Sequence, residues 1–196
     1  MKIYRAERAG ADGEVTKRRH STKRAPLNVP YLVDNLWEWT RPDGYPNRRF
    51  SIFAAPSREV AAESAYVADT IYEVCSLVPP KALIAQIPGV KDARYHPDCK
   101  TLPRKLLELL GREKWTEKGL EEKRVLAPLW APALLKEEVE SLMPPEVREE
   151  MKEAVTLWKD VALLPFDVDG DLADDVGEVF IEADEVILRR VCESED

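Results

Sequence analysis

The chain has 196 residues, of which 44% are hydrophobic and 34% charged, as is ordinary for a soluble globular protein. No apolar run approaches the roughly 18 residues of a membrane-spanning helix, and the first residues, MKIYRAERAG, lack the apolar core of a signal peptide. The three cysteines (Cys75, Cys99 and Cys192) are odd in number and unevenly spaced, so we expect a cytoplasmic protein without a disulfide framework.

The net charge of −8 is unevenly distributed along the chain. Residues 1–24 carry a basic excess, whereas residues 166–196 are strongly acidic. Overall acidity disfavours nonspecific binding to duplex nucleic acid. The basic segment is suited to an anionic ligand such as a pyrophosphate, although a solvated basic loop facing acidic strands explains most of its residues equally well.

The first ninety residues alternate between predicted strands and helices. Hydrophobic alternation predicts strands over 1–6, 48–55 and 70–78, and a further extended segment over 81–87. Helical spacing predicts a helix over 30–39 and another over 58–68, the latter capped by Ser57. The polar and basic stretch 10–24 predicts a loop, and Pro42-Asp43-Gly44 predicts a turn.

From residue 91 to about residue 162 the pattern becomes helical. Helices are predicted over 102–110, 134–143 and 145–161, with Gly111 placed where a glycine commonly ends a helix. This segment predicts a helical insertion within a single domain that spans residues 1–196.

The stretch 177–191 returns to β structure, as two strands or one kinked strand broken at Ala183-Asp184. The order of elements along the chain predicts an α+β fold. Glu178 opens this last β segment. A carboxylate there is held at a sheet rim and can still meet a ligand, although a solvated strand end is the simpler interpretation of the segment by itself.

Four separated segments match the motifs of one known family in their order and spacing. They are Tyr4-Arg5-Ala6, the serine-containing segment 50–61, the strand and proline turn in 70–82, and Gly177–Ile181. Together they resemble the arginine, serine and Glu-Val-apolar-apolar strands of the ADP-ribosyltransferase superfamily, which consumes NAD. The resemblance implies an ADP-ribosyltransferase-like split β-sheet with flanking helices, to which the helical insertion is added.

The resemblance also implies roles for individual residues. Arg5 would hold the pyrophosphate of NAD by paired, charge-assisted hydrogen bonds, and the small Ala6 would admit the nicotinamide amide to backbone groups. Ser51 would orient the ribose or Glu178. Glu178 would be the catalytic carboxylate, stabilising the positive charge that develops on the ribose as nicotinamide leaves. Phe53, Tyr66 or Tyr72 would stack on nicotinamide, with Phe53 favoured.

The implied activity is NAD-dependent transfer of ADP-ribose to a macromolecular acceptor, as in bacterial toxins and phage effectors, with protein favoured over nucleic acid as the acceptor. The sequence departs from the family's pattern in two places. Val176 stands where arginine-modifying members carry a second acid, which disfavours arginine as the acceptor. Ser51 is the one hydroxyl that matches the family's serine motif.

A calcium site is one alternative interpretation of the acidic segment before Glu178. Asp167, Asp169, Asp171 and Glu178 fall at positions 1, 3, 5 and 12 of a calcium-binding loop. The turn-forming glycine of that motif is replaced by Leu172, and the following segment is apolar β structure instead of a helix. These departures argue against calcium binding.

Two further alternatives remain. His96 and Cys99 have the types and spacing of a metal-ligand pair, but no other soft ligand is suitably spaced, so we predict no bound metal. The alternative from another functional class is a non-enzymatic binding or adaptor protein, either a degenerate member of the same fold or an unrelated α+β protein that uses Trp37, Trp39 and the acidic C-terminal segment.

Overall fold

The structure is a computed structural model, and it describes residues 2–8, 13–19, 24–66, 69–79, 82–111, 115–165 and 171–191. The chain divides into two compact units. The sheet unit comprises Met1–Thr22, Gly44–Asp92 and Val161–Asp196, and the helical unit comprises Lys23–Asp43 and Ala93–Asp160.

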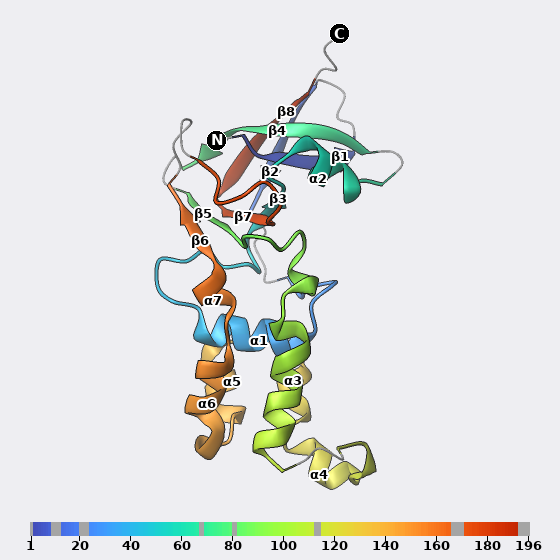
Figure 1. Ribbon diagram of the computed structural model, residues 1–196, viewed down its shortest axis with the longest axis vertical. Helices are drawn as coiled ribbons and strands as arrows, with labels where there is room; N and C mark the ends of the chain where they lie inside the picture. Colours follow the sequence, from blue (N-terminus) through green and yellow to red (C-terminus); the bar gives the residue numbers. More distant parts are fainter. Residues whose placement is uncertain are drawn as a thin grey trace. The chain divides into compact units, whose positions relative to one another are not determined.

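The sheet unit contains two antiparallel four-stranded sheets, so the predicted α+β class is confirmed (Figure 1). Sheet A has the order β1 (Tyr4–Arg8), β4 (Asp69–Val78), β8 (Glu185–Arg190) and β2 (Glu14–Arg18). Sheet B has the order β3 (Ile52–Ala54), β7 (Val179–Glu182), β5 (Leu83–Gln86) and β6 (Ala162–Leu164). Helix α2 (Arg58–Glu63) follows β3, and the Oγ of Ser57 caps it by accepting from the backbone N–H of Val60, as predicted.

The chain passes from one sheet to the other at Ala183-Asp184, the predicted break. The strand before it, β7, lies in the interior of sheet B, and the strand after it, β8, lies in the interior of sheet A. The two sheets are also joined at Tyr4 and Ala55, which exchange both backbone hydrogen bonds at 2.8 and 2.7 Å. The last strands therefore run through the middle of both sheets.

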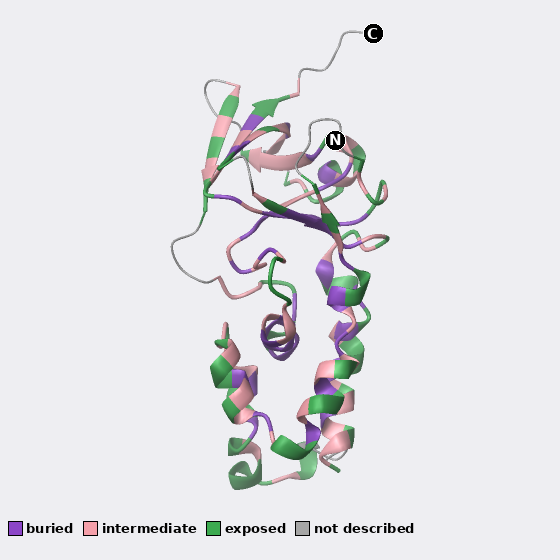
Figure 2. Ribbon diagram, turned by 90° about the vertical axis from the view of Figure 1, so that its left-hand side faces the viewer, coloured by how far each residue is buried: buried purple, intermediate pink, exposed green. Residues whose placement is uncertain are grey.

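The hydrophobic core of the sheet unit draws on strands of both sheets, which Figure 2 shows as the buried central strands. Its fully or almost fully buried members include Ile3, Ile52, Tyr72, Ile84, Val179, Ile181, Val186 and Leu188. Successive side chains of a strand point to opposite faces. Since Val179 and Ile181 belong to this core, Glu178, Phe180 and Glu182 lie on the other face of sheet B.

Two predictions for this unit were wrong in detail. The predicted loop 10–24 contains β2, which pairs with β8. It is an edge strand in which Glu14, Lys17 and Arg18 are charged, and such a strand lacks the hydrophobic signal used for prediction. The strand predicted over 48–55 is reduced to β3, because residues 47–51 form a turn in which the Ser51 backbone N–H bonds to the Arg48 carbonyl.

The helical unit is built around α1 (Tyr31–Thr40), whose residues Leu32, Val33, Leu36 and Trp37 are almost completely inaccessible to solvent. The other helices are α3 (Asp98–Leu109), α4 (Leu120–Arg124), α5 (Lys136–Leu142), α6 (Arg148–Ala154) and α7 (Leu157–Asp160). Short 3-10 turns occur at Ala93–Tyr95, Trp115–Glu117, Ala127–Trp130 and Pro145–Val147. None of the helices in the described ranges has the length and apolar character needed to cross a membrane.

The bounds of the helical unit can be compared with the predicted insertion. Its second segment, 93–160, lies just inside the predicted range of 91–162. Its first segment, 23–43, contains α1 and was not predicted to belong with the insertion. The single long helix predicted over 145–161 is instead a 3-10 turn at Pro145–Val147 followed by α6 and α7, and the extended backbone of Val155 ends α6.

A buried carboxylate ties the helical unit together. Asp98, at the start of α3, is 1% exposed. Its side chain accepts hydrogen bonds from the indole of Trp37 at 2.9 Å, the hydroxyl of Thr156 at 2.8 Å and the backbone N–H of Leu157 at 3.1 Å. These contacts connect α1, α3 and the beginning of α7.

Replacing Asp98 by Asn is expected to destabilise the helical unit by about 3 kcal/mol, because an amide nitrogen would face buried donors and the charge-assisted bonds would be lost. Urea unfolding followed by tryptophan fluorescence measures this selectively, since all five tryptophans belong to this unit. The matched control is Asp160→Asn, at a carboxylate that is 52% exposed, which should shift stability by less than about 1 kcal/mol. Equal effects of the two variants would contradict the role of Asp98.

Candidate functional site

Glu178 stands immediately before β7, and its backbone is held by the end of the neighbouring strand. Its carbonyl accepts from the backbone N–H of Ile87 at 3.0 Å, and its own N–H donates to the carbonyl of Val90 at 2.8 Å. The residue is 9% exposed. The predicted catalytic carboxylate therefore projects from rigid backbone at the end of a central strand.

The turn that leads into Glu178 is fixed by the buried side chain of Gln86. The Gln86 amide nitrogen donates to the carbonyls of Asp174 at 2.9 Å and Gly177 at 3.1 Å, and the amide oxygen accepts from the N–H of Ala173 at 2.8 Å. The carboxylate of Asp174 in turn accepts from the N–H groups of Val176 at 3.0 Å and Gly177 at 2.6 Å. Buried polar groups satisfied in this way specify one backbone path.

Gly177 is required by the close approach of two backbone segments. A Cβ atom at this position would lie 2.2 Å from the carbonyl oxygen of Ile87 and 3.0 Å from the Cα of Pro88. Neither neighbour is a flexible side chain, so the clash would be relieved only by moving the strand end that holds Glu178.

The Gly177→Ala variant is expected to lose at least about 2 kcal/mol of stability, as overpacking against backbone does. Thermal unfolding followed by circular dichroism measures the loss. Gly119→Ala is the matched control, because a Cβ there meets nothing within 4 Å and the backbone φ of −71° suits alanine. A Gly177→Ala protein as stable as the control would show that the close approach is not a constraint.

Glu178 is in contact with a cation that lies against two aromatic rings. Phe53 and Phe180 are direct partners in the pairing of β3 with β7. The guanidinium carbon of Arg48 lies 4.9 Å from the ring centroid of Phe53 and 4.8 Å from that of Phe180. The Nη1 of Arg48 is 2.8 Å from the Oε1 of Glu178, and the two side chains are 10% and 11% exposed. We call these four side chains the Glu178 cluster.

Ser51 lies at the other end of the same strand pair. Because β3 and β7 are antiparallel, Ser51, two residues before Phe53, is on the side of Glu182, whereas Glu178, two residues before Phe180, is on the side of Ala55. Four residues of strand separate the two ends, or roughly 13 Å. The Oγ of Ser51 donates to the carbonyl of Asn47 at 2.8 Å.

Arg5 is next to the Glu178 cluster and shares Phe53 with it. Its Nη1 donates to the carbonyl oxygen of Phe53, the residue whose ring contacts Arg48. Its Nε donates to Glu7 at 2.6 Å, and the side chain is 27% exposed. Phe53 therefore contacts Arg5 through its carbonyl and Arg48 through its ring, and Arg48 in turn contacts Glu178.

The remaining candidate residues have the following positions. Ala6 lies on β1 and pairs with Ile71 of β4. Tyr66 follows α2 and is 83% exposed, whereas Tyr72 is completely buried in the core of the sheet unit.

Glu7 links Arg5 to a second cation, Lys17, at 2.7 Å. Partial burial by itself would raise the pKa of Glu7. Hydrogen bonds from Lys17 and Arg5, together with their charges, outweigh burial and hold the pKa of Glu7 below its ordinary value. The contact joins β1 to β2, the two edge strands of sheet A.

The lowered pKa of Glu7 predicts a pH-dependent contribution to stability. A carboxyl whose pKa is lower in the folded protein stabilises it fully above the ordinary value of about 4.3, and this contribution is lost as pH falls through the lowered pKa. Glu7→Gln should therefore cost about 1 kcal/mol near neutral pH and progressively less below pH about 4.

Urea unfolding of both proteins across that pH range measures the difference. The control is Glu14→Gln, whose ion pair with Arg189 is long, at 3.9 Å, and exposed. A difference between wild type and Glu7→Gln that stays constant into acid would contradict the assigned electrostatics.

Sequence reasoning missed Arg48, Gln86 and Asp174. The alternation of side chains along β7 puts Phe180 on the same face as Glu178. No local pattern marked Arg48 as the partner of Glu178, because the two are distant in sequence and meet only through the pairing of β3 with β7. Gln86 and Asp174 were likewise invisible, since their role depends on one turn packing against another strand.

The predicted metal alternatives can also be compared with the structure. Asp167 and Asp169 lie outside the described residues, while Asp171 is exposed. The His96 Nδ1 accepts from the Asp98 N–H at 3.2 Å, and Cys99 donates to the carbonyl of Ala93 at 3.4 Å. In the described part of the chain, no group of three or more His, Cys, Asp or Glu residues is arranged to hold a metal ion.

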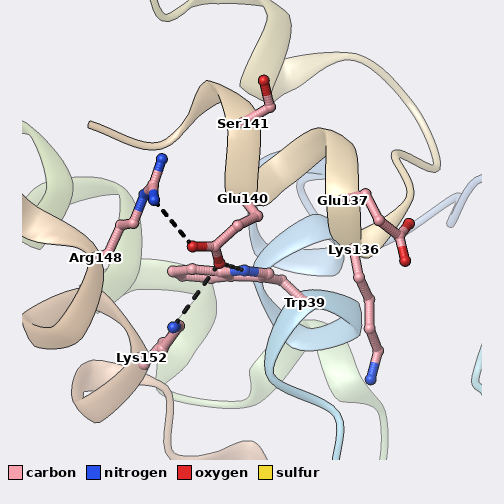
Figure 3. A pocket seen from close by; sticks show the side chains of 7 residues that line it. All are labelled: Trp39, Lys136, Glu137, Glu140, Ser141, Arg148 and Lys152. Carbon is pink, nitrogen blue, oxygen red and sulfur yellow. Dashed lines mark hydrogen bonds and ion pairs between the residues drawn. The ribbon is translucent and has the colours of Figure 1, made fainter. Parts of the chain in front are cut away.

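The helical unit has an open pocket of about 510 Å³ beside Trp39 (Figure 3). Figure 3 shows Arg148 and Lys152 converging on the Glu140 carboxylate, with Arg148 at 3.1 Å and Lys152 at 3.8 Å. The indole N–H of Trp39 donates to the same carboxylate at 2.7 Å. The lining carries three cations (Lys136, Arg148 and Lys152) against two carboxylates (Glu137 and Glu140), so most of the charge is compensated within the pocket.

Comparisons with protein-family models, with curated proteins and with solved structures found no significant match to this chain.

Proposed function

We propose that the protein is an NAD-dependent ADP-ribosyltransferase that moves ADP-ribose to a macromolecular acceptor, with protein favoured as the acceptor. The observation that carries the proposal is the chain of contacts that runs from Arg5 through Phe53 and Arg48 to Glu178. The carbonyl of Phe53 accepts a hydrogen bond from Arg5. The guanidinium of Arg48 contacts both the ring of Phe53 and the carboxylate of Glu178. A cation for phosphate, an aromatic ring and a fixed carboxylate are the groups that cleavage of NAD at the ribose requires.

The strand arrangement supports these roles. Tyr4 is bridged to Ala55, and Ala54 pairs with Val179, so two strand spacings, or roughly 10 Å, separate β1 from the start of β7. An extended dinucleotide can place its pyrophosphate at Arg5 and its nicotinamide ribose at Glu178 across such a span. Ser51 lies at the far end of the strand pair, so we assign the orientation of the ribose to Arg5 and Phe53. The role of Ser51 in orienting the ribose or Glu178 stays a prediction.

The proposed chemistry makes few demands on the protein. The bond between nicotinamide and the ribose breaks, nicotinamide leaves as a neutral molecule, and positive charge develops on the ribose. Glu178 stabilises that charge, and its rigid backbone keeps the carboxylate in place without reorganisation during the reaction. The acceptor nucleophile then attacks the ribose carbon and releases its proton to solvent.

A non-enzymatic binding protein is the second candidate. It is favoured by one observation: the Glu178 carboxylate is 11% exposed and already paired with Arg48. A carboxylate that is buried and neutralised in this way would have a structural role, in shaping a surface that binds a partner.

Incubation with labelled NAD and cell lysate, with release of nicotinamide measured in parallel, separates the two candidates. Glu178→Gln is expected to lower both signals by at least about 100-fold, as loss of a preorganised charge in an active site does. The control is Glu185→Gln, which removes a carboxylate that is 35% exposed and pairs with Arg18 at the surface. Circular dichroism verifies that both variants are folded.

Label transfer that survives unchanged in Glu178→Gln would refute the catalytic role of Glu178. Wild-type protein that neither binds NAD in calorimetry nor releases nicotinamide would favour the binding protein.

A further inference from the structure

Within the Glu178 cluster, the carboxylate of Glu178 and the rings of Phe53 and Phe180 have the composition of a cation-binding pocket. The cation that occupies it is the side chain of Arg48. The Arg48 guanidinium contacts one carboxylate at 2.8 Å and the faces of two rings at 4.9 and 4.8 Å. These are the contacts that a planar, delocalised cation makes in a binding site, where aromatic faces and a carboxylate together replace its hydration.

We propose that this pocket binds a planar organic cation, and that Arg48 is a displaceable internal occupant that competes with it. Where the inference identifies that cation as the pyridinium ring of NAD, it rests on the proposed function. Arg48 then acts as a built-in competitor that must leave before the nicotinamide end of the dinucleotide can enter.

The walls of the pocket are fixed independently of Arg48. Phe53 and Phe180 lie on paired strands, and the backbone of Glu178 is bonded on both sides to the end of β5 and the residues after it. Removing the guanidinium therefore leaves the carboxylate and both rings in position.

The occupant, in contrast, is carried on a turn by a long and flexible side chain. The backbone of this turn is anchored next to Arg48, where the N–H of Asn47 donates to Glu182 at 2.6 Å and the Asn47 carbonyl accepts from Ser51 at 2.8 Å. These anchors do not involve the guanidinium, so the backbone of the turn can stay in place when the Arg48 side chain rotates out of the pocket.

The energetics favour exchange over simple opening. Departure of Arg48 without replacement would leave a buried carboxylate uncompensated, which is strongly unfavourable. A second cation restores the neutralisation and the ring contacts, so the exchange carries only a small net penalty. The pocket therefore stays closed in the absence of a cation, and the apparent affinity for a cation is reduced by the fraction of time that Arg48 occupies the site.

The test uses Arg48→Ala and the probe 1-methylnicotinamide, a planar cation that cannot donate ADP-ribose. We expect the probe to raise the melting temperature of Arg48→Ala with a half-saturating concentration at least about tenfold lower than that of wild type. Neutral nicotinamide should have a much smaller effect, and the double variant Arg48→Ala/Glu178→Gln should lose the response. Arg18→Ala, which removes an arginine that is 80% exposed, should respond as wild type does.

Arg48→Lys keeps the test decisive if Arg48→Ala fails to fold. Lysine preserves a charge beside Glu178 but stacks less well on the rings, so the probe should displace it at a lower concentration than it displaces arginine. An Arg48→Lys protein with the same half-saturating concentration as wild type would overturn the inference.

The outcomes separate this inference from the proposed function. Equal responses to the probe in wild type, Arg48→Ala and the double variant would overturn the cation pocket, even where Glu178-dependent release of nicotinamide from NAD upholds the enzyme. A probe response that requires Glu178 and is strengthened by Arg48→Ala, with no release of nicotinamide from NAD by any variant, would uphold the pocket and refute the enzyme.

Discussion

The hydrogen bonds of the buried Gln86 amide are the constraint on which the candidate site depends. This side chain uses its donor and acceptor atoms to hold the turn at 173–177 against the end of β5. The turn brings Gly177 so close to Ile87 that no side chain fits between them. The backbone of Glu178 is consequently fixed at the start of β7 by its own hydrogen bonds, independently of any contact that the carboxylate makes.

The two partners of the buried ion pair differ in how they are held. Glu178 is fixed by strands and by a satisfied polar network, while Arg48 reaches it from a turn and lies over Phe53 and Phe180. A buried ion pair adds little to stability once its desolvation is counted, so stability alone is a weak explanation for placing a guanidinium there. The asymmetry between a rigid carboxylate and a movable cation is what a ligand site with an internal competitor requires.

Local signals in the sequence predicted the elements whose own residues favour the observed backbone conformation. The strand at 70–78, the Ser57 cap and the two strands on either side of Ala183-Asp184 all follow from β-branched runs, turn residues and capping preferences. The β2 strand could not be predicted in this way, since its charged residues form a strand only because β8 offers an open edge.

The candidate site was predictable only in part, for the same reason. Arg5, Phe53 and Glu178 were predicted from motif order, and in the structure Phe53 contacts Arg5 while Arg48 contacts both Phe53 and Glu178. Ser51 was assigned to the same site, but antiparallel pairing puts it at the other end of its strand. The contact between Arg48 and Glu178 depends on strand register, which no local pattern of residues specifies.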